Sequence, residues 1–246
     1  MKKIVFLLWR DAGGDDLRDE LLGPVSERLL GAGAENIVMN LRDAKARRSR
    51  SPAPTLSMSQ PICAQVNVWL QDEQDWRPFA DILRDAGFIV AGYLVEESIY
   101  KDYGENRHGS PRNWDDGERS PGISLITLMP RPGRIDRQEW IRRWHGTMSP
   151  VSEAIQPRTR YVRNLVQEKL TPGAPDYEGM VEEAWPSPRH VSNPFLFYGS
   201  RNPFGVLVNM ARILRAVTSF LSLRHIRTVM LSEYFVKTGG VRSPLH

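Results

Sequence analysis

Carboxylates that could transfer protons stand in two apolar segments of the chain. Glu233 lies in the run HIRTVMLSEYFVK, and Glu97 lies in FIVAGYLVEESIY. Strand alternation places each glutamate on a face of mostly apolar side chains. A carboxylate on such a face is unfavourable unless it is paired, and its pKa tends to rise. Each residue could therefore be a general acid or base, or could form a structural salt bridge or hydrogen bond across a sheet interface.

His145 is a further candidate for proton transfer. It follows the bulky residues Trp140, Ile141 and Trp144 in a helical pattern. Because an imidazole titrates near neutral pH, His145 could act as a general base. The alternative is a histidine that is hydrogen-bonded at the edge of the core. The corresponding place in the first half of the chain holds Asp19, so we expect the second half to build most of any site.

Glu183 and Tyr161 could complete an acid–base site. In GMVEEAW, Glu183 shares parity with Val181 and Trp185, and it could face the same interior as Glu233. Tyr161 could donate a hydrogen bond to a carbonyl oxygen, or it could be an aromatic residue of the core. The predicted catalytic residues are therefore His145, Glu183, Glu233 and Tyr161.

Aromatic side chains could line an apolar pocket beside these groups. The segment NPFLFYGSRNPFG (193–205) could cover such a pocket, or it could be a loop held by its own aromatic rings. Asn164 in YVRNL recurs as Asn40 in IVMNL, which favours a role in fixing a strand or loop over a role in binding. The predicted substrate-binding residues are Trp144, Phe197, Tyr198 and Asn164.

The elements that must position these side chains follow one order in both halves. Runs rich in β-branched and aromatic residues, such as KKIVFLLW and PICAQVNVWL, predict strands, and segments with apolar residues at helical spacing predict helices. Pro24 should bend or break the first helix. Each half therefore has the ferredoxin-like order βαββαβ. We place one unit at 1–103, a polar linker at 104–120, a second unit at 121–237 and a tail at 238–246.

A repeated tetrapeptide supports a duplication. PVSE occurs at 24–27 and again at 150–153, late in the first helical segment of each unit. The landmarks Asn40 and Asn164, and then Glu97 and Glu233, recur in the same order in equivalent elements. One such unit leaves one face of its sheet open, and two can bury their open faces against each other. The predicted fold is thus α+β, with two tandem ferredoxin-like units whose antiparallel sheets pack into an α/β barrel. It is a pseudo-dimer within one chain, and a homodimer is left open.

Composition bounds the compartment and the class of protein. The chain has 246 residues, 41% of them hydrophobic and 25% charged, which is ordinary globular composition. The start MKKIVFLLWRDAGG mimics a signal peptide, but its apolar run is short and Arg10 and Asp11 follow at once, which favours a buried strand. Cys63 is the only cysteine, so disulfides within the chain and cysteine-rich metal sites are excluded. We expect a cytoplasmic protein that does not insert into a membrane.

Several motifs that would indicate other functions are absent. The sequence has no G-x-G-x-x-G that opens a helix, no Walker A motif and no G-x-S-x-G elbow. Its five histidines lack H-x₃-H spacing, so we expect no metal site and no cofactor. The basic stretch AKARRSRSPAP (44–54) could contact nucleic acid, but it lacks aromatic residues on which bases could stack. We interpret it as a solvated loop and expect no nucleic-acid partner.

The second half resembles a known family. WHGTMSP in a tryptophan-rich helix, YVRN on the next strand, then EGMVEEAW and VMLSEYFV make residues 121–237 similar to the EthD family of the dimeric α/β-barrel superfamily. The family pattern W-x-x-x-H-x-P would place a histidine where Met148 stands, and His145 lies nearby. The superfamily includes cofactor-free polyketide cyclases, small monooxygenases, lactone isomerases and haem peroxidases. The resemblance therefore implies the barrel fold and a pocket for a small molecule.

These observations lead to two functional hypotheses. The first is a cofactor-independent enzyme that acts on a hydrophobic, aromatic or polyketide-like carbonyl compound by cyclisation, dehydration or isomerisation. His145 would be its base, Glu183 or Glu233 its second acid or base, and Tyr161 would polarise the carbonyl. The second is a non-catalytic binding or accessory protein for an apolar metabolite. Convergence of His145 and a carboxylate in one pocket would favour the enzyme.

Overall fold

The computed structural model describes residues 1–10, 15–49 and 62–238. Its first half contains the strands and helical segments in the order expected from the sequence, and in addition one short helix, α3, at the start of the basic stretch that we interpreted as a loop. These are β1 (Lys2–Trp9), α1 (Asp15–Glu20), α2 (Ser26–Gly31), β2 (Asn36–Leu41), α3 (Ala44–Arg47), β3 (Ile62–Leu70), α4 (Arg77–Asp85) and β4 (Ile89–Lys101). The basic stretch is described as far as Ser49, and its residues 50–54 lie outside the described residues.

The second half has the same arrangement of strands, lacks a counterpart of α3 between its second and third strands, and adds two short helices before its last long one. Its elements are β5 (Ile123–Met129), α5 (Arg137–Arg143), α6 (Ser149–Ile155), β6 (Arg160–Lys169), β7 (Gly179–Trp185), α7 (Pro188–Ser192), α8 (Pro194–Phe197), α9 (Pro203–Phe220) and β8 (Arg227–Lys237). Of the predicted tail, residues 239–246 lie outside the described residues.

The eight strands form one closed antiparallel barrel in the order β1-β3-β2-β8-β5-β7-β6-β4. In each half the first strand lies between the third and the fourth, which is the ferredoxin-like arrangement. The two half-sheets join where β2 pairs with β8 and where β4 pairs with β6. The structure thus confirms an α+β barrel, and the barrel closes within a single chain. That the halves arose by duplication stays a prediction.

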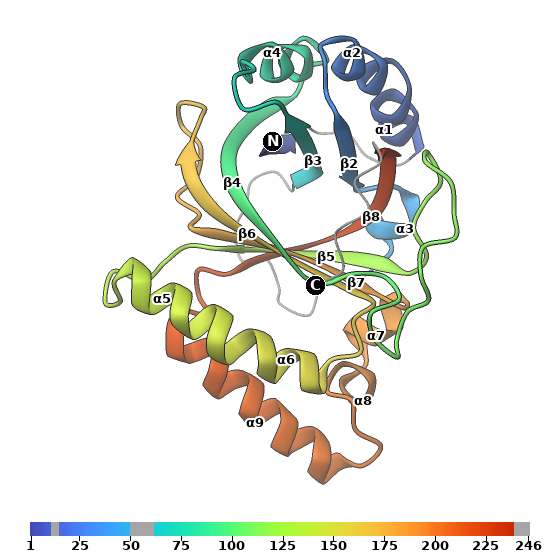
Figure 1. Cartoon of the computed structure of the whole chain (residues 1–246). Helices are drawn as coiled ribbons and strands as arrows, with labels where there is room; N and C mark the ends of the chain where they lie inside the picture. Colours follow the sequence, from blue (N-terminus) through green and yellow to red (C-terminus); the bar gives the residue numbers. More distant parts are fainter. Residues whose placement is uncertain (11–14, 50–61, 239–246) are drawn as a thin grey trace.

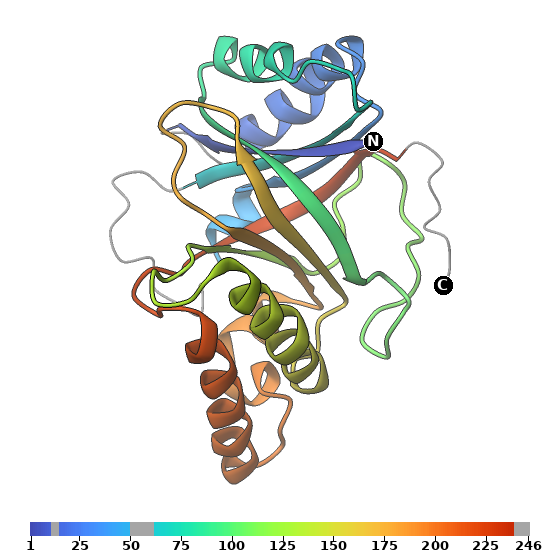
Figure 2. The ribbon, with the colours of Figure 1, turned by 60° about the vertical axis from the view of Figure 1, so that its left-hand side comes forward.

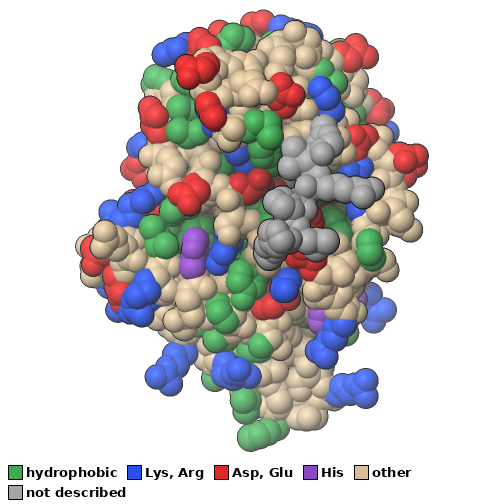
Figure 3. Space-filling model, viewed as in Figure 1, with side chains coloured by type: hydrophobic (Ala, Val, Ile, Leu, Met, Phe, Trp, Pro, Cys, Tyr) green, Lys and Arg blue, Asp and Glu red, His purple; other side chains and the backbone are tan. Residues whose placement is uncertain are grey.

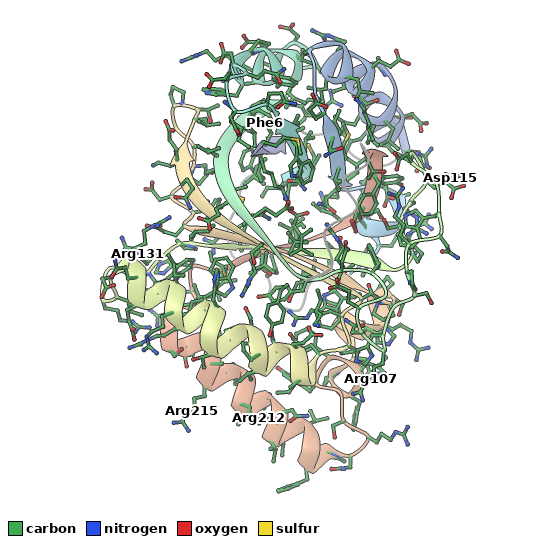
Figure 4. The ribbon with its side chains drawn as sticks, in the orientation of Figure 1. Phe6, Arg107, Asp115, Arg131, Arg212 and Arg215 are labelled. Atoms are coloured by element: carbon green, nitrogen blue, oxygen red, sulfur yellow. The ribbon has the colours of Figure 1, made fainter. Side chains whose placement is uncertain are left out.

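Two helical layers cover the outside of the barrel. Figure 1 shows α1, α2 and α4 over one half-sheet, and α5, α6 and α9 over the other. Figure 2, turned by 60°, shows the same separation, with the barrel between the two layers. Strand β1 is buried on both faces: Phe6 packs under the first-half helices, and its neighbours Val5 and Leu7 point into the barrel. Phe6 is labelled in Figure 4, between the strands and the upper helices.

The first helical segment of each half contains a π-helical turn. One spans Leu21–Val25 between α1 and α2, and the other spans Trp144–Met148 between α5 and α6. The first turn contains Pro24, and Gly23 there departs from helical geometry at φ −93° and ψ −108°, as the proline predicts. The serines of the two PVSE copies, Ser26 and Ser152, each donate a hydrogen bond to the carbonyl three residues before them. The two copies thus share this serine bond, but Pro24 lies in the first π-helical turn whereas Pro150 follows the second one, in α6.

The segment between the halves is packed against β8 rather than free. The amide of Gly117 donates to the Phe235 carbonyl at 2.7 Å, and that of Ser120 donates to the Glu233 carbonyl at 2.8 Å. Arg119 forms an isolated β-bridge with Tyr234. Residues predicted as a polar linker thus extend the sheet edge beside β8, before β5 begins.

The surface divides by charge. In the view of Figure 3, acidic side chains gather over the end with α2 and α4, and lysine and arginine gather over the end with α9. Helix α9 contains no acidic residue. In the residues that the structure describes, no helix has the length and apolar character needed to cross a bilayer.

Candidate functional site

The barrel interior contains a buried carboxylate with four hydrogen-bond donors. Glu182 on β7 accepts from Lys3 at 3.0 Å and Asn164 at 2.8 Å through Oε1, and from Asn40 at 3.2 Å and Asn67 at 2.9 Å through Oε2. The donors come from four strands, β1, β6, β2 and β3. A carboxylate offers about four lone-pair positions, so Glu182 is saturated by its neighbours.

Lys3 connects this carboxylate to a second one. Its ammonium lies 2.8 Å from Oε1 of Glu97 and 4.7 Å from the centre of the Trp69 ring. The indole nitrogen of Trp69 also donates to Glu97, at 3.2 Å. For Glu97 the structure therefore shows the structural salt bridge that was one of its two predicted roles. We call Lys3, Asn40, Asn67, Glu97, Asn164 and Glu182 the interior cluster.

Glu233 lies nearby on β8 with different partners. The Tyr103 hydroxyl donates to its Oε2 at 2.8 Å, and Arg160 lies 3.3 Å from its Oε1. Arg160 is in turn held by Asp102 at 2.9 Å. As alternation predicted, Glu233 shares the inward face of β8 with Leu231, which packs in the barrel interior.

Burial and neighbouring charges shift the pKa values of Glu182 and Glu233 in opposite directions. Burial raises the pKa of Glu182, but Lys3, Arg160 and the amide donors outweigh it and bring that pKa below its ordinary value. Burial also raises the pKa of Glu233, and Arg160 and Tyr103 only partly offset it because Glu182 and Asp102 add negative charge. Burial and Glu233 raise the pKa of Tyr103 far above its ordinary value, so its hydroxyl keeps its proton. This arrangement pairs a carboxyl that can gain a proton with a fixed hydrogen-bond donor.

Aromatic rings surround Glu233 and Tyr103 where the segment between the two halves packs against β8. The Tyr103 ring lies edge-on to Trp114 with centroids 4.9 Å apart, and Phe235 completes the group at 6.4 Å from Tyr103. The Arg112 guanidinium lies over Phe235 at 4.3 Å. Tyr103 and Trp114 are half-buried. We call Tyr103, Trp114, Phe235 and Glu233 the mouth cluster.

His145 lies outside the barrel, in the π-helical turn of the second half. Its ring is edge-on to Trp144 at 4.7 Å, and its Nε2 is buried with no hydrogen-bond partner in the part of the chain that the structure describes. Burial, and then the charge of Arg163, lower the pKa of His145 to about 4. The imidazole is therefore neutral at pH 7, and the sheet separates it from Glu233.

Glu183 and Tyr161 also face the helices, which corrects the prediction that Glu183 faces the barrel interior. The Glu183 carboxylate pairs at 2.6 Å with Arg158, whose guanidinium lies 3.9 Å above the Tyr161 ring. Tyr161 packs with Trp140 and Trp144 in the helix-side core. Strand β7 is buried on both faces. Its neighbouring residue Glu182 is the carboxylate that points into the barrel, where it bonds to Lys3.

The predicted substrate-binding residues are dispersed. Trp144 is fully buried, and its indole nitrogen lies 3.4 Å from the Tyr161 hydroxyl. Phe197 stacks on Trp185 at 5.1 Å outside the barrel, and Tyr198 lies edge-on to Phe197 at 5.0 Å. Phe197 is thus held both by Trp185 of β7 and by its neighbour Tyr198. Asn164 alone of this set reaches the interior cluster.

The structure thus divides the predicted residues between two sides of one sheet. Glu233 and Asn164 are inside the barrel, whereas His145, Tyr161, Glu183 and Trp144 lie under the helices. Sequence reasoning missed Lys3, Glu182, Arg160 and Tyr103. Lys3 stood in a segment that resembled a leader, and Tyr103 stood at the end of the first unit, next to the polar linker. Neither context signals a buried partner.

No metal centre is formed by the described residues, in which no three His, Cys, Asp or Glu side chains come together as ligands could. Cys63 is buried, and burial raises the pKa of its thiol to about 11.

Comparison with known proteins establishes the fold. No family model matches the chain, and no curated protein matches it. A solved structure of an anthrone oxidase-like protein has a TM-score of 0.55 at 8% identity, over 98% of this chain and 96% of that chain. A dye-decolorizing peroxidase from Bacteroides thetaiotaomicron has a TM-score of 0.47 at 7% identity, over 95% of this chain and 93% of that chain. The first of these likenesses shows that the chain shares an α+β barrel fold with proteins of known structure.

Proposed function

We propose that the chain is an enzyme of EthD type that moves protons on a hydrophobic, aromatic or polyketide-like carbonyl compound, and that Glu233 is its general base. One observation supports this choice above the others. Glu233 is a buried carboxyl with a raised pKa, and it is hydrogen-bonded by a tyrosine hydroxyl among aromatic rings. A raised pKa brings a carboxyl closer to the working pH, where a general base is most effective.

The mouth cluster supplies the parts that such a reaction needs. The Glu233 carboxylate would take a proton from the carbon next to the carbonyl. The Tyr103 hydroxyl, which donates to Glu233 in the resting structure, would then turn to donate its hydrogen bond to the enolate oxygen that forms. Protonated Glu233 would then return the proton, to another carbon in an isomerisation or to a departing hydroxyl as water in a dehydration. Arg160 would compensate the charge on Glu233. Trp114 and Phe235 suit an aromatic substrate.

The comparison and the resemblance support the substrate class. The name of the anthrone oxidase-like protein refers to an aromatic ketone. The superfamily that the EthD resemblance of 121–237 implies includes cofactor-free polyketide cyclases. His145 fits the base less well than Glu233, because no carboxylate pairs with it and the sheet separates it from the mouth cluster.

The test compares four forms of the protein. Wild type, Glu233→Gln, Tyr103→Phe and His145→Ala would be incubated with cell extract and with a panel of aromatic β-diketones, with consumption followed by mass spectrometry. We expect a compound that wild type and His145→Ala consume and Glu233→Gln does not, and about a 100-fold slower reaction for Tyr103→Phe because it loses one oxyanion donor. Full activity in Glu233→Gln, or its loss in His145→Ala alone, would overturn the assignment.

A pH titration tests Glu233 without a substrate. Because its pKa is raised in the folded state, the folded protein holds this proton more tightly than the unfolded chain does. The free energy of unfolding should therefore fall as pH rises from about 4.3, the unfolded value, through the raised pKa. In Glu233→Gln this part of the fall should be absent. Urea unfolding of both proteins between pH 4 and pH 8 measures the difference, and superimposable curves would contradict a raised pKa.

A second candidate is a binding or accessory protein for an apolar metabolite. The separation of His145 from Glu233 favours it, because the predicted acid and base do not share one pocket. The same mass spectrometry distinguishes the two: a compound that all four proteins retain unchanged identifies a binding protein. Quenching of the Trp114 fluorescence, absent in Trp114→Phe, would then place that compound at the mouth cluster.

A further inference from the structure

A basic groove lies outside the barrel, on the other side of the sheet from the interior cluster and the mouth cluster. It has a volume of about 420 Å³ and is bordered by α1, α3, α7, the segment before β5, and β8. Figure 1 shows α1, α3 and α7 along one side of the barrel next to β8. Its charged lining consists of Arg18, Lys45, Arg48, Arg119, Asp15 and Asp43. With four cations and two carboxylates, the formal charge of the lining is 4 − 2 = +2.

The carboxylates of the groove are already occupied. Asp43 accepts from the Ala46 amide at 2.8 Å, from the Ser232 hydroxyl at 2.9 Å and from the Tyr234 hydroxyl at 2.8 Å. Asp15 pairs with Arg18 at 3.1 Å. Asp43 therefore anchors α3 to β8, and its negative charge still acts on Lys45.

Two cations of the groove have no such partner. Among the described residues, Lys45 and Arg48 make no side-chain hydrogen bond or ion pair. Lys45 is half-buried, and burial together with the nearby Arg119 lowers its pKa. Arg119 is held in place because its NH1 donates to the Ser120 and Gly122 carbonyls at 3.3 and 3.2 Å. Asp43 acts on Lys45 from nearby, but the half-buried ammonium forms no ion pair among the described residues, and a bound anion would relieve the cost of its burial.

We propose that this groove binds the phosphate group of a small phosphorylated molecule. Lys45, Arg48 and Arg119 would contact the phosphate, and the charge of +2 complements a dianion. The space suits a phosphate with a small organic group attached. The site is independent of the mouth cluster, because Tyr234 and Glu233 are adjacent on β8 and therefore point to opposite faces of the sheet.

The binding test uses the full chain at constant ionic strength. Inorganic phosphate and phenyl phosphate would be titrated by calorimetry, with benzoate and sulfate as comparison anions. We expect phenyl phosphate to bind, and Lys45→Gln and Arg48→Gln each to bind it at least about tenfold more weakly, because each loses a charge-assisted hydrogen bond. Lys45→Arg should retain binding. The control is Arg215→Gln, which removes an exposed cation that points into solvent from α9 (Figure 4).

Each outcome decides the proposal. Equal weakening in Arg215→Gln and Lys45→Gln would show general charge attraction and overturn it. Benzoate binding as tightly as phenyl phosphate would show a carboxylate site and overturn the phosphate assignment. Urea unfolding provides the folding control: Lys45→Gln should be as stable as wild type or more stable, because it removes an unpaired half-buried charge. Loss of binding together with loss of stability would place Lys45 in the fold instead.

Discussion

The two halves of the barrel share their strand order but supply complementary groups to the interior. The first half contributes the cation Lys3, its partner Glu97 and the amide donors Asn40 and Asn67. The second contributes Glu182, the carboxylate that accepts from both halves, and the amide donor Asn164. Register makes the contrast sharper. Asn67 pairs with Val38 as Glu182 pairs with Val162, so an amide and a carboxylate occupy equivalent positions and bond to each other at 2.9 Å. Neither half can satisfy its inward polar groups alone, which ties the stability of each to the closed barrel.

The largest expected effect comes from removing the cation that the first half supplies. Lys3→Met leaves the buried Glu182 and the half-buried Glu97 without their shared ammonium. We expect a loss of about 3–5 kcal/mol in the free energy of unfolding, because an uncompensated buried charge remains. Urea unfolding measures it. The matched control is Lys2→Met, whose ammonium bonds to the Asp72 carbonyl at the surface and should matter little. A loss below about 1 kcal/mol for Lys3→Met would mean that Glu182 takes up a proton instead.

The second effect compares equivalent asparagines in the two halves. Asn164 and Asn40 occupy corresponding strands, and both donate to Glu182, at 2.8 and 3.2 Å. The Oδ1 atoms of both are buried without a partner in the described structure, so that penalty is the same in each half. Replacing either by alanine should cost about 1–3 kcal/mol, the price of an unsatisfied charged group, with the larger loss at Asn164. Thermal and urea unfolding check this, and a larger loss at Asn40 would reverse the comparison.

Much of the fold could be predicted because each half carries a complete local signal. Strand alternation, helical spacing and the repeated PVSE gave the order βαββαβ twice, and alternation put Glu233 on the inward face of β8. The same reasoning placed Glu183 wrongly because β7 is buried on both faces. Alternation shows that Glu182 and Glu183 point to opposite faces of β7. It does not tell which face lies inside the barrel, because helices cover the outer face and both faces are therefore buried.

The rest of the site depends on contacts distant in sequence. Tyr103 reaches Glu233 across 130 positions, and Lys3 reaches Glu182 across 179. No periodicity links such pairs, so a single sequence shows an isolated lysine near the start and a tyrosine in a polar segment. The expected convergence of His145 with Glu233 was missed for a related reason. The helical segment of His145 agrees with the sequence pattern, but the side of the sheet on which that segment packs is set by barrel closure.

The smallest expected effect separates the two PVSE copies. Ser26 and Ser152 both donate to the carbonyl three residues earlier, and Ser26 shares its proton with the Leu22 carbonyl at 2.5 Å. Ser152 in addition accepts from the fully buried Arg158 at 3.0 Å. Ser26→Ala should therefore lose about 0.5–1.5 kcal/mol, the net value of one ordinary hydrogen bond. Ser152→Ala should lose up to about 1 kcal/mol more, because the buried Arg158 guanidinium loses one of its three acceptors and keeps only Glu153 and Glu183. Urea unfolding of the two variants side by side measures the difference. Equal losses in the free energy of unfolding for Ser26→Ala and Ser152→Ala would show that Arg158 finds another acceptor when the Ser152 hydroxyl is removed. The two serines would then contribute equally to stability.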